Sequence, residues 1–320
     1  MKKFLSLLMA LCMVLSFTAV AEEAAEVKTG LSFTTDLAKS KDGQSQANIS
    51  ITAVTVDENG VITQCVIDVI QGKIAFDATG KITTDKATVF QSKQELKDGY
   101  NMRGASSISA EWFEQANAFA AYCVGKTAEQ LQAIELNEKG QAVDIVASCT
   151  LTANEFLHGV LDAVAKAEYR GAKAGDVLKL TQYSTASNSK DATESADGQT
   201  QVYTHVGMFT LNGDVITSAY IDAVQASVKF NAEGKITSDL TAAVLTKNEL
   251  QEGYGMKKIS PIGKEWFEQA AGFSAWITGK TFADALAMGV NEKGYPTEAD
   301  VITTCTMNVN DMMVVLRKAQ

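Results

Sequence analysis

The pattern of hydrophobic and polar positions predicts a β-hairpin in the first part of the chain. Residues 49–56 alternate between apolar and polar side chains and are rich in β-branched types, which favour strands. Asn59 and Gly60 form a dipeptide typical of hairpin turns, and residues 61–75 continue as a second strand. A third, short strand is predicted at residues 88–91. The same pattern returns at residues 202–211, 215–230 and 242–245.

A helical period follows each of these predicted sheets. The first helix is expected to begin at Ser106 and its counterpart at Ser260, where Pro261 takes the first-turn position that proline prefers. Apolar residues then recur at the spacing of one helix face, so the tryptophan among them is expected in the core. In the first copy this face consists of Ile108, Trp112, Phe113, Ala116, Phe119, Ala120 and Cys123.

Self-similarity divides the chain into two units. The hexapeptide from Glu111 to Ala116 recurs unchanged from Glu265 to Ala270. A period of about 150 residues is the size of a whole domain and not of a solenoid repeat. We therefore predict an α+β protein of two tandem homologous domains, each an antiparallel β-sheet, built as a hairpin or meander, packed with helices. Their predicted ranges are residues 22–170 and 171–320.

One motif recurs just ahead of the closing helix of each copy. In the first copy it runs from Asp144 to Thr150 as Asp-Ile-Val-Ala-Ser-Cys-Thr, and Thr152 with Glu155 predicts a capped helix start. Thr150 is therefore expected two residues ahead of a helix N-terminus, where free N–H groups and the helix dipole favour a phosphate. An ordinary strand-to-helix corner would give the same pattern. The corresponding residues of the second copy are Asp300, Thr306, Asn308 and Asp311.

A loop that recurs closely in both copies supplies further candidates. It contains Lys-Gln-Glu-Leu followed by Asp-Gly-Tyr in the first copy, and Lys-Asn-Glu-Leu followed by Glu-Gly-Tyr in the second. Since loops often carry binding residues, Glu95 and Tyr100 are candidate ligand contacts beside Thr150. A shared packing role for the tyrosine would look the same. The corresponding candidates beside Thr306 are Glu249 and Tyr254.

The first residues have the pattern of a secretory signal peptide. Lys2 and Lys3 precede an apolar run that ends at Phe17, and small residues suit cleavage after Ala21. Residues 1–21 are therefore predicted to be a signal peptide, and the protein is expected to be secreted or extracytoplasmic. The apolar run is too short to cross a bilayer, and no later segment approaches about 18 consecutive apolar residues, so no membrane span is expected.

Charge and cysteine content narrow the function classes. The net charge of −10 disfavours nucleic acid and anionic membranes as partners, because both favour a basic surface. Only Cys149 and Cys305 occupy equivalent positions, so the repeat encodes no internal disulfide and free thiols are expected. The two histidines do not recur, and no group has metal-ligand spacing, so no metal site is predicted. The cysteines outside the predicted signal peptide are Cys65, Cys123, Cys149 and Cys305.

This order of parts resembles the extracytoplasmic FMN-binding domain family. Its members include FMN-bearing subunits of membrane NADH:quinone and ferredoxin oxidoreductases and secreted flavoproteins of extracellular electron transfer. They combine a hairpin, a loop with glutamate, a segment with Trp, Phe and Gly-Lys, and Asp-x-x-Ser/Thr-Gly-Ala-Thr before a terminal helix. In the family the last threonine is joined to FMN by a phosphoester bond. By this resemblance, which covers nearly all of each copy, Asp144 with Thr150 and Asp300 with Thr306 would be the motif's aspartate and acceptor threonine.

The chain departs from the family motif at its glycine. The first copy has Ala147-Ser148-Cys149 in place of Ser/Thr-Gly-Ala, and the second has Thr303-Thr304-Cys305. Glycine there would let the backbone approach a phosphate closely. FMN is therefore expected to be held without a covalent bond, if it is bound.

Two functions of different classes follow. The first is a secreted flavoprotein of extracytoplasmic electron transfer, whose partners are the flavin, or another small molecule, and a redox protein outside the cytoplasm. The alternative is a flavin-free, non-catalytic binding or structural protein on the same fold. No nucleophile with a positioned base recurs in both copies, so no catalytic residue is assigned, and the sequence leaves open whether the protein is an enzyme.

Overall fold

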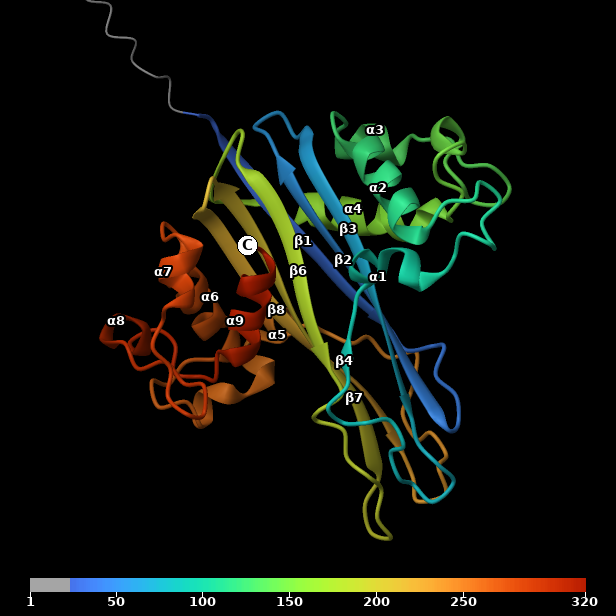
Figure 1. Cartoon of the computed structure of the whole chain (residues 1–320), viewed down its shortest axis with the longest axis vertical. Coiled ribbons are helices and arrows are strands. Elements are labelled where there is room, and N and C mark those ends of the chain that lie inside the picture. Colours follow the sequence, from blue (N-terminus) through green and yellow to red (C-terminus); the bar gives the residue numbers. More distant parts are fainter. Residues whose placement is uncertain (1–23) are drawn as a thin grey trace, which may run out of the picture.

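The computed structural model describes residues 24–320 and has an α+β architecture (Figure 1). Within these residues, two four-stranded antiparallel sheets lie face to face, with strand orders β3-β2-β1-β5 and β4-β6-β7-β8. The first sheet contains β1 (Glu26–Asp36), β2 (Gln44–Val56), β3 (Ile62–Ala75) and β5 (Glu168–Lys173). The second contains β4 (Val89–Phe90), β6 (Val177–Thr185), β7 (Gly198–Asn212) and β8 (Val215–Phe230).

Helices cover the outer face of each sheet, so the layers run helices, sheet, sheet, helices (Figure 1). The first sheet is covered by α1 (Lys93–Leu96), α2 (Trp112–Cys123), α3 (Ala128–Gln132) and α4 (Ala153–Ala165). The second is covered by α5 (Lys247–Leu250), α6 (Trp266–Ile277), α7 (Phe282–Leu286), α8 (Ala299–Ile302) and α9 (Asn310–Lys318). Short 3₁₀ turns are η1 (Lys97–Tyr100), η2 (Val143–Ile145), η3 (Gln251–Tyr254) and η4 (Met256–Lys258).

The strands predicted from alternation are largely confirmed. The two predicted hairpins are β2 with β3 and β7 with β8, and the short strand predicted at residues 88–91 is β4. Residues 242–245 form no strand, because they pair with no neighbouring strand; Val244 packs instead against the layer between the sheets. In both halves the hairpin is followed by a short helix, a long helix, another short helix and a closing helix, and the second half has the additional short helix α8 before its closing helix.

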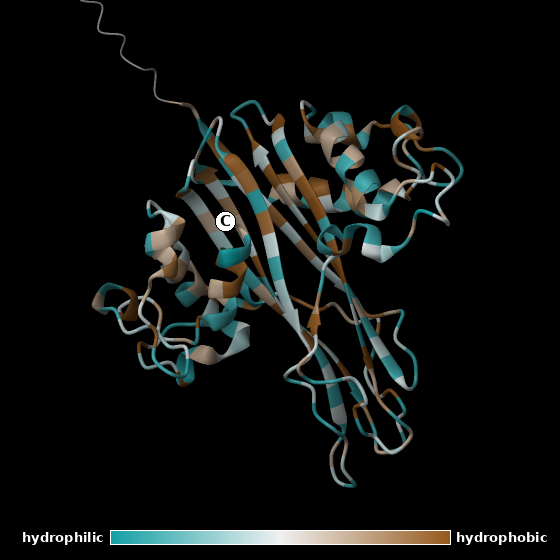
Figure 2. Ribbon diagram, viewed as in Figure 1, coloured by the Kyte–Doolittle hydropathy of each residue, from teal (hydrophilic) through white to brown (hydrophobic). Residues whose placement is uncertain are grey.

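The layer between the two sheets is a shared hydrophobic core. Alternate residues of β2, such as Ile49 and Ile51, point into it and meet Val206 and the other apolar residues of the second sheet. The banding of hydropathy along the strands in Figure 2 reflects this alternation. Near the ends of the two hairpins, the rings of Phe76 and Phe230 stack with centroids 4.1 Å apart and planes 11° from parallel. This core joins the two halves of the chain.

Each half also has a separate core under its own helices. In the first half, α4 packs directly on β1 at Gly30, where an added Cβ would lie 1.9 Å from the carbonyl oxygen of Ala163. Trp112, Phe119 and Phe156 fill the space between helices and sheet. The tryptophan that the helical pattern placed in the core is therefore buried, as predicted.

Strands and ion pairs also cross between the halves. The short β4 follows the first hairpin in sequence, yet it pairs with β6 of the second sheet. Strand β5 contains the domain boundary predicted near Arg170, and it pairs with β1 of the first sheet. The Nζ atom of Lys166 lies 3.2 Å from Glu249, and that of Lys318 lies 2.6 Å from Glu95. The first half thus contributes a strand to the second sheet, and ion pairs join the two halves.

The long helices begin six residues later than the sequence pattern suggested. The expected starts were Ser106 and Ser260, whereas α2 begins at Trp112 and α6 at Trp266. The reason is visible at Glu111, whose carboxylate accepts N–H groups from the preceding loop instead of continuing a helix. Pro261 consequently lies in a turn and not in the first turn of a helix.

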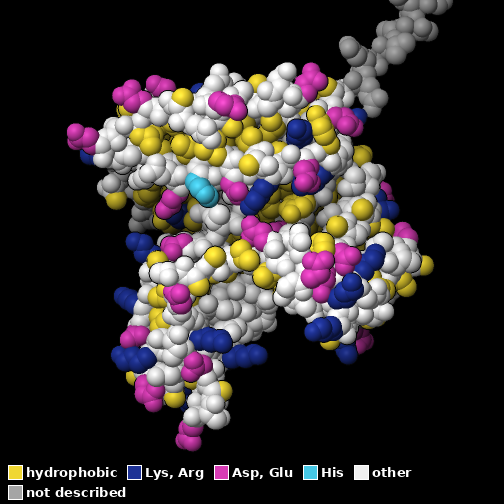
Figure 3. All heavy atoms as spheres, turned by 180° about the vertical axis from the view of Figure 1, so that it is seen from behind, with side chains coloured by type: hydrophobic (Ala, Val, Ile, Leu, Met, Phe, Trp, Pro, Cys, Tyr) yellow, Lys and Arg dark blue, Asp and Glu magenta, His cyan; other side chains and the backbone are white. Residues whose placement is uncertain are grey.

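The predicted signal peptide, residues 1–21, lies outside the described residues. Within residues 24–320, no helix is long and apolar enough to cross a membrane. In the same part of the chain the four cysteines are free thiols, and three of them are buried. No group of three or more His, Cys, Asp and Glu residues could hold a metal ion there. On the face shown in Figure 3, basic side chains lie interspersed with acidic ones.

Candidate functional site

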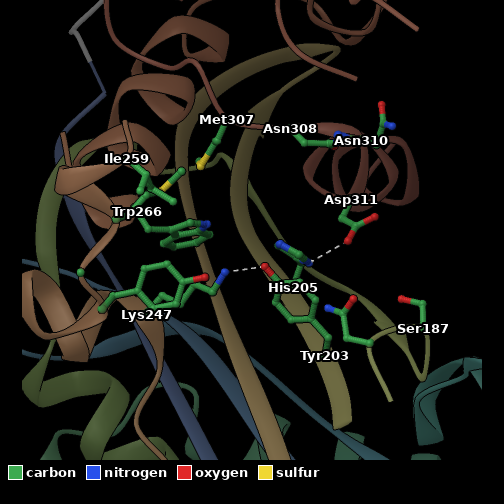
Figure 4. Close-up of a pocket in the computed structure, with 14 residues that line it drawn as sticks. Ser187, Tyr203, His205, Lys247, Ile259, Trp266, Met307, Asn308, Asn310 and Asp311 are labelled. Carbon is green, nitrogen blue, oxygen red and sulfur yellow. Dashed lines mark hydrogen bonds and ion pairs between the residues drawn. The ribbon is translucent and has the colours of Figure 1, made fainter. Parts of the chain in front are cut away.

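Two cavities occupy corresponding places beside the closing helices. The cavity of the second half has a volume of about 510 Å³ and lies between β7, the loop after α5, α6 and the start of α9 (Figure 4). The cavity of the first half, about 650 Å³, lies between β2, β3, α2 and the start of α4. Corresponding lining residues are Lys93 and Lys247, Tyr100 and Tyr254, Met102 and Met256, and Trp112 and Trp266.

Lys247 is the central polar group of the second cavity. Its side chain is only 3% exposed, because the first turn of α5 packs it against β8 and under α6. Its Nζ lies 5.0 Å from the ring centre of Trp266, 4.5 Å from that of Tyr254 and 4.6 Å from that of Tyr203. It donates a hydrogen bond of 2.5 Å to the Tyr203 hydroxyl. An aromatic cage therefore surrounds the amine.

The cage supplies no counter-ion for this amine. Among the described residues, no carboxylate lies within ion-pair distance of Lys247. Nearby carboxylates pair with other cationic residues instead, as Glu249 does with Lys166. Burial lowers the pKa of Lys247 to about 7, although the more distant carboxylates of Asp222 and Asp311 act in the opposite direction. The amine is consequently available in both its charged and its neutral form near neutral pH.

His205 and Asp311 form the opposite wall of the cavity (Figure 4). His205 Nδ1 lies 3.4 Å from Asp311 Oδ2, but the geometry is not that of a hydrogen bond, and Nδ1 is buried without a partner. Burial lowers the pKa of His205 to about 3, so the imidazole is neutral and the contact is not an ion pair. Burial also raises the pKa of Asp311. The wall is thus polar, and its imidazole is uncharged.

The start of each closing helix lacks the side-chain cap predicted from the sequence. Thr152 does precede α4, but its side chain accepts no capping hydrogen bond. Before α9 the capping position belongs to Val309, because the chain turns one residue later than expected, and Asn308 accepts only the N–H of Asn310. The next N–H groups of an α-helix have no partner within the helix. Each cavity is therefore bordered by a helix start with free donors.

Thr150 and Thr306 lie beside the cavities but do not line them. The N–H and hydroxyl of Thr306 both donate to Oε1 of Gln269, at 2.8 and 3.2 Å. Thr150 donates in the same way to Gln115, at 2.8 and 3.1 Å. The residues that follow, Leu151 and Met307, do line the cavities. The two glutamines thus fix the motif against the long helix of each half.

The two hydrogen bonds from Thr306 to Gln269 give a testable prediction about stability. Replacing Gln269 by Leu leaves the half-buried N–H of Thr306 without this acceptor, so we expect a loss of about 2 kcal/mol in the free energy of unfolding. The Thr306→Val control keeps that N–H bond and loses only the hydroxyl, and it should cost about 1 kcal/mol or less. Urea denaturation would compare them. Equal effects of the two substitutions would show that the hydrogen bond from the Thr306 N–H contributes little to stability.

The other candidates from the sequence have partners outside the cavities. Asp144 accepts from the Tyr122 hydroxyl at 2.8 Å, and Asp300 accepts from Trp276 Nε1 at 2.7 Å. Both carboxylates are exposed on the outer side of the helices. Glu95 accepts from the N–H of Ser92 and Glu249 from that of Thr246, which caps the short helices α1 and α5. The two glutamates also make the ion pairs between the halves.

Tyr100 and Tyr254 are the sequence candidates that line the cavities. The chain reaches each of them through a backbone that few non-glycine residues adopt. Lys97 has φ 48° and ψ −122°, and Gln251 has φ 47° and ψ −123°. Such strain persists only where the surroundings impose it. The same unusual turn in both halves directs a tyrosine toward the cavity.

Sequence reasoning missed several residues of these sites. Lys93 and Lys247 occupy the same place in the recurring loop, and that repetition could have identified them. Gln115 and Gln269, the glutamines of the repeated hexapeptide, could have been found in the same way. Tyr203 and His205 left no such signal, because Asn48 and Ser50 line the corresponding part of the first cavity.

Comparisons with known proteins do not assign the chain to a family. No family model, no curated protein and no solved structure matches it.

Proposed function

We propose that the protein binds a planar, anionic small molecule, with FMN as the first candidate, in the cavity of each half. The observation that carries this proposal is the buried amine of Lys247, which has an aromatic cage and no carboxylate partner among the described residues. A ligand anion would provide the missing counter-charge, and flat rings would suit the tryptophan and tyrosine of the cage. Cavities of this size are typical of small-molecule sites.

The residues of the second cavity are of types that suit FMN. Trp266, Tyr254 and Met307 offer apolar surface for its ring system, and Lys247 and the uncapped start of α9 offer donors for its phosphate. Bound flavin would supply the electron-transfer chemistry. The resemblance to extracytoplasmic FMN-binding domains supports this proposal, as does the apolar leader predicted for residues 1–21. We accordingly propose secretion, flavin binding and electron exchange with an extracytoplasmic redox partner as the function.

The two halves are proposed to have arisen from one ancestral domain by duplication. The recurrence of the same lysine, tyrosine and tryptophan around both cavities supports this proposal. The sites differ in detail, because the first cavity has polar Asn48 and Ser50 where the second has Tyr203 and His205. Lys93 is half-buried, whereas Lys247 is buried. We therefore expect the second site to bind more tightly.

The test is titration of FMN into the full chain, followed by quenching of flavin fluorescence. We expect saturable binding that Lys247→Met weakens by about 10-fold or more, because a hydrogen bond to a charged group contributes about 1.5 to 3 kcal/mol. Lys280→Met is the matched control, since this lysine lies over Trp276 outside the cavity, with Nζ 4.5 Å from the ring centre. It should leave the affinity unchanged.

Two outcomes would contradict the proposal of non-covalent flavin binding. If the wild-type chain shows no saturable quenching, the flavin proposal fails and the flavin-free binding or structural protein becomes the better account. Intact mass after co-expression with a flavin transferase should show no FMN adduct, because Gln269 holds the Thr306 hydroxyl outside the cavity. An adduct on Thr306 would show that the missing glycine does not prevent covalent attachment.

A further inference from the structure

The amine of Lys247 has the surroundings of a reactive group as well as those of a binding group. It is buried, it lines a cavity of about 510 Å³, and it has no carboxylate partner among the described residues. Lysines that serve only structure commonly form ion pairs, as Lys166 and Lys318 do here. In Figure 4 the end of the Lys247 side chain lies between the aromatic rings and the wall formed by His205 and Asp311.

We propose that Lys247 captures an aldehyde in this cavity as an imine. The Nζ lone pair attacks the carbonyl carbon, and a carbon–nitrogen bond forms. The carbonyl oxygen then leaves as water, taking up the two protons that the amine loses overall. The product is a carbon–nitrogen double bond between the ligand and Lys247, with no net oxidation or reduction. This proposal does not depend on flavin, which carries no aldehyde.

Neighbouring groups can support both steps of this reaction. Tyr203 holds Nζ in one place through its 2.5 Å hydrogen bond. The carboxyl group of Asp311 borders the same cavity, and carboxyl groups can act as general acids toward a departing hydroxyl. Desolvation keeps a large fraction of the amine neutral near neutral pH. The titratable groups around Lys247 are Tyr203 and His205 from β7, Asp222 from β8, Tyr254 from η3 and Asp311 from α9.

The surroundings also define the class of aldehyde. The rings of Tyr254 and Trp266 favour a flat, conjugated ligand. The uncapped start of α9 across the cavity favours an anionic substituent at the far end of that ligand. We therefore assign the site to aromatic or conjugated aldehydes that carry a phosphate or carboxylate.

The probe is pyridoxal 5′-phosphate, a flat aromatic aldehyde with a phosphate. The full chain is incubated with it at pH 7.5, the imine is reduced with borohydride, and tryptic peptides are mapped by mass. We expect the label on Lys247 to form at least 10-fold faster than on any exposed lysine. A typical exposed lysine keeps about 0.1% of its amine neutral at this pH, whereas a pKa near 7 leaves most of it neutral.

Three controls make the result decisive. In urea-unfolded chain the preference for Lys247 should disappear, because it depends on the cavity. Lys247→Arg should remove the labelled peptide, while Lys93, its half-buried counterpart in the first half, should label more slowly. Pyridoxal without the phosphate should label Lys247 more weakly. Label spread over exposed lysines with Lys247 unlabelled would overturn the proposal, and this wild-type map decides even if a variant does not fold.

Discussion

The two halves of the chain, separated from one another, are expected not to fold as stable monomers. A protease site inserted after Gly175 would leave β5 with the first half and cut the chain in an exposed turn. After cleavage, the two fragments should remain together in size-exclusion chromatography under native conditions. Each fragment expressed alone should instead aggregate or lack a cooperative unfolding transition. Mixing the unfolded fragments and removing denaturant should restore the complex.

The reason is the amount of apolar surface that the halves bury against each other. Ile49, Ile51, Ile70 and Ile74 of the first half are fully buried in the layer shared with the second sheet. Each fully buried side chain of this type contributes roughly 1.5 to 3 kcal/mol, so the four amount to about 6 to 12 kcal/mol. That is comparable to the whole stability of a typical domain. Exposure of this face would remove a contribution of that size and leave the first half with only the core under its own helices.

The sequence alone favours the opposite expectation, because each copy contains a complete set of strands and helices. Two fragments that each unfold cooperatively as monomers would restore that view. A useful control is the uncut chain with the same inserted site, which separates the effect of cleavage from that of the insertion. A second control is Lys166→Ala with Lys318→Ala, which removes the crossing ion pairs; we expect a small effect, since exposed ion pairs contribute about 0 to 1 kcal/mol.

The local pattern predicted the hairpins and the short strand β4, but not β1, β5 and β6. Strands β2, β3, β7 and β8 are long and rich in apolar residues, because over much of their length one face lies on helices and the other on the opposing sheet. Strand β1 contains Gly30, which weakens a strand pattern but is required where α4 touches its backbone. Strand β5 is short and polar, and its pairing with β1 depends on residues far away in sequence. Periodicity could not reveal such a pairing.

The candidate site was predicted in part, and for a physical reason. Repetition in the sequence directed attention to the loop with Tyr100 and Tyr254, and both residues line cavities. The same repetition could not separate binding residues from structural ones. Glu95 and Glu249 recur because they cap short helices, which a sequence motif shows equally well. Only the folded chain shows that Lys247 lacks a counter-ion, because that property depends on β7, β8 and α9 together.

The second large effect concerns the pH dependence of stability. Lys247 has an ordinary pKa of 10.5 when exposed and about 7 in the folded protein. Between these values the unfolded chain binds a proton that the folded chain does not, so raising the pH stabilises the fold. This stabilising contribution of the Lys247 amine is fully present above pH 10.5 and is lost as the pH falls to about 7. Each unit of pH in this window corresponds to about 1.4 kcal/mol.

We therefore expect wild-type protein to gain about 2 kcal/mol in its free energy of unfolding between pH 7 and pH 9, relative to Lys247→Met. Subtracting the variant removes most of the contribution of the other titrating groups, including Asp222, whose pKa burial raises to about 7. Urea denaturation at each pH measures the difference. Lys280→Met is the control, because it removes a half-buried lysine that lies over Trp276, outside the cavity. If the difference in free energy of unfolding between wild type and Lys247→Met does not change with pH, the Lys247 amine stays charged in the folded protein. The aldehyde reaction proposed for it would then lose its neutral nucleophile.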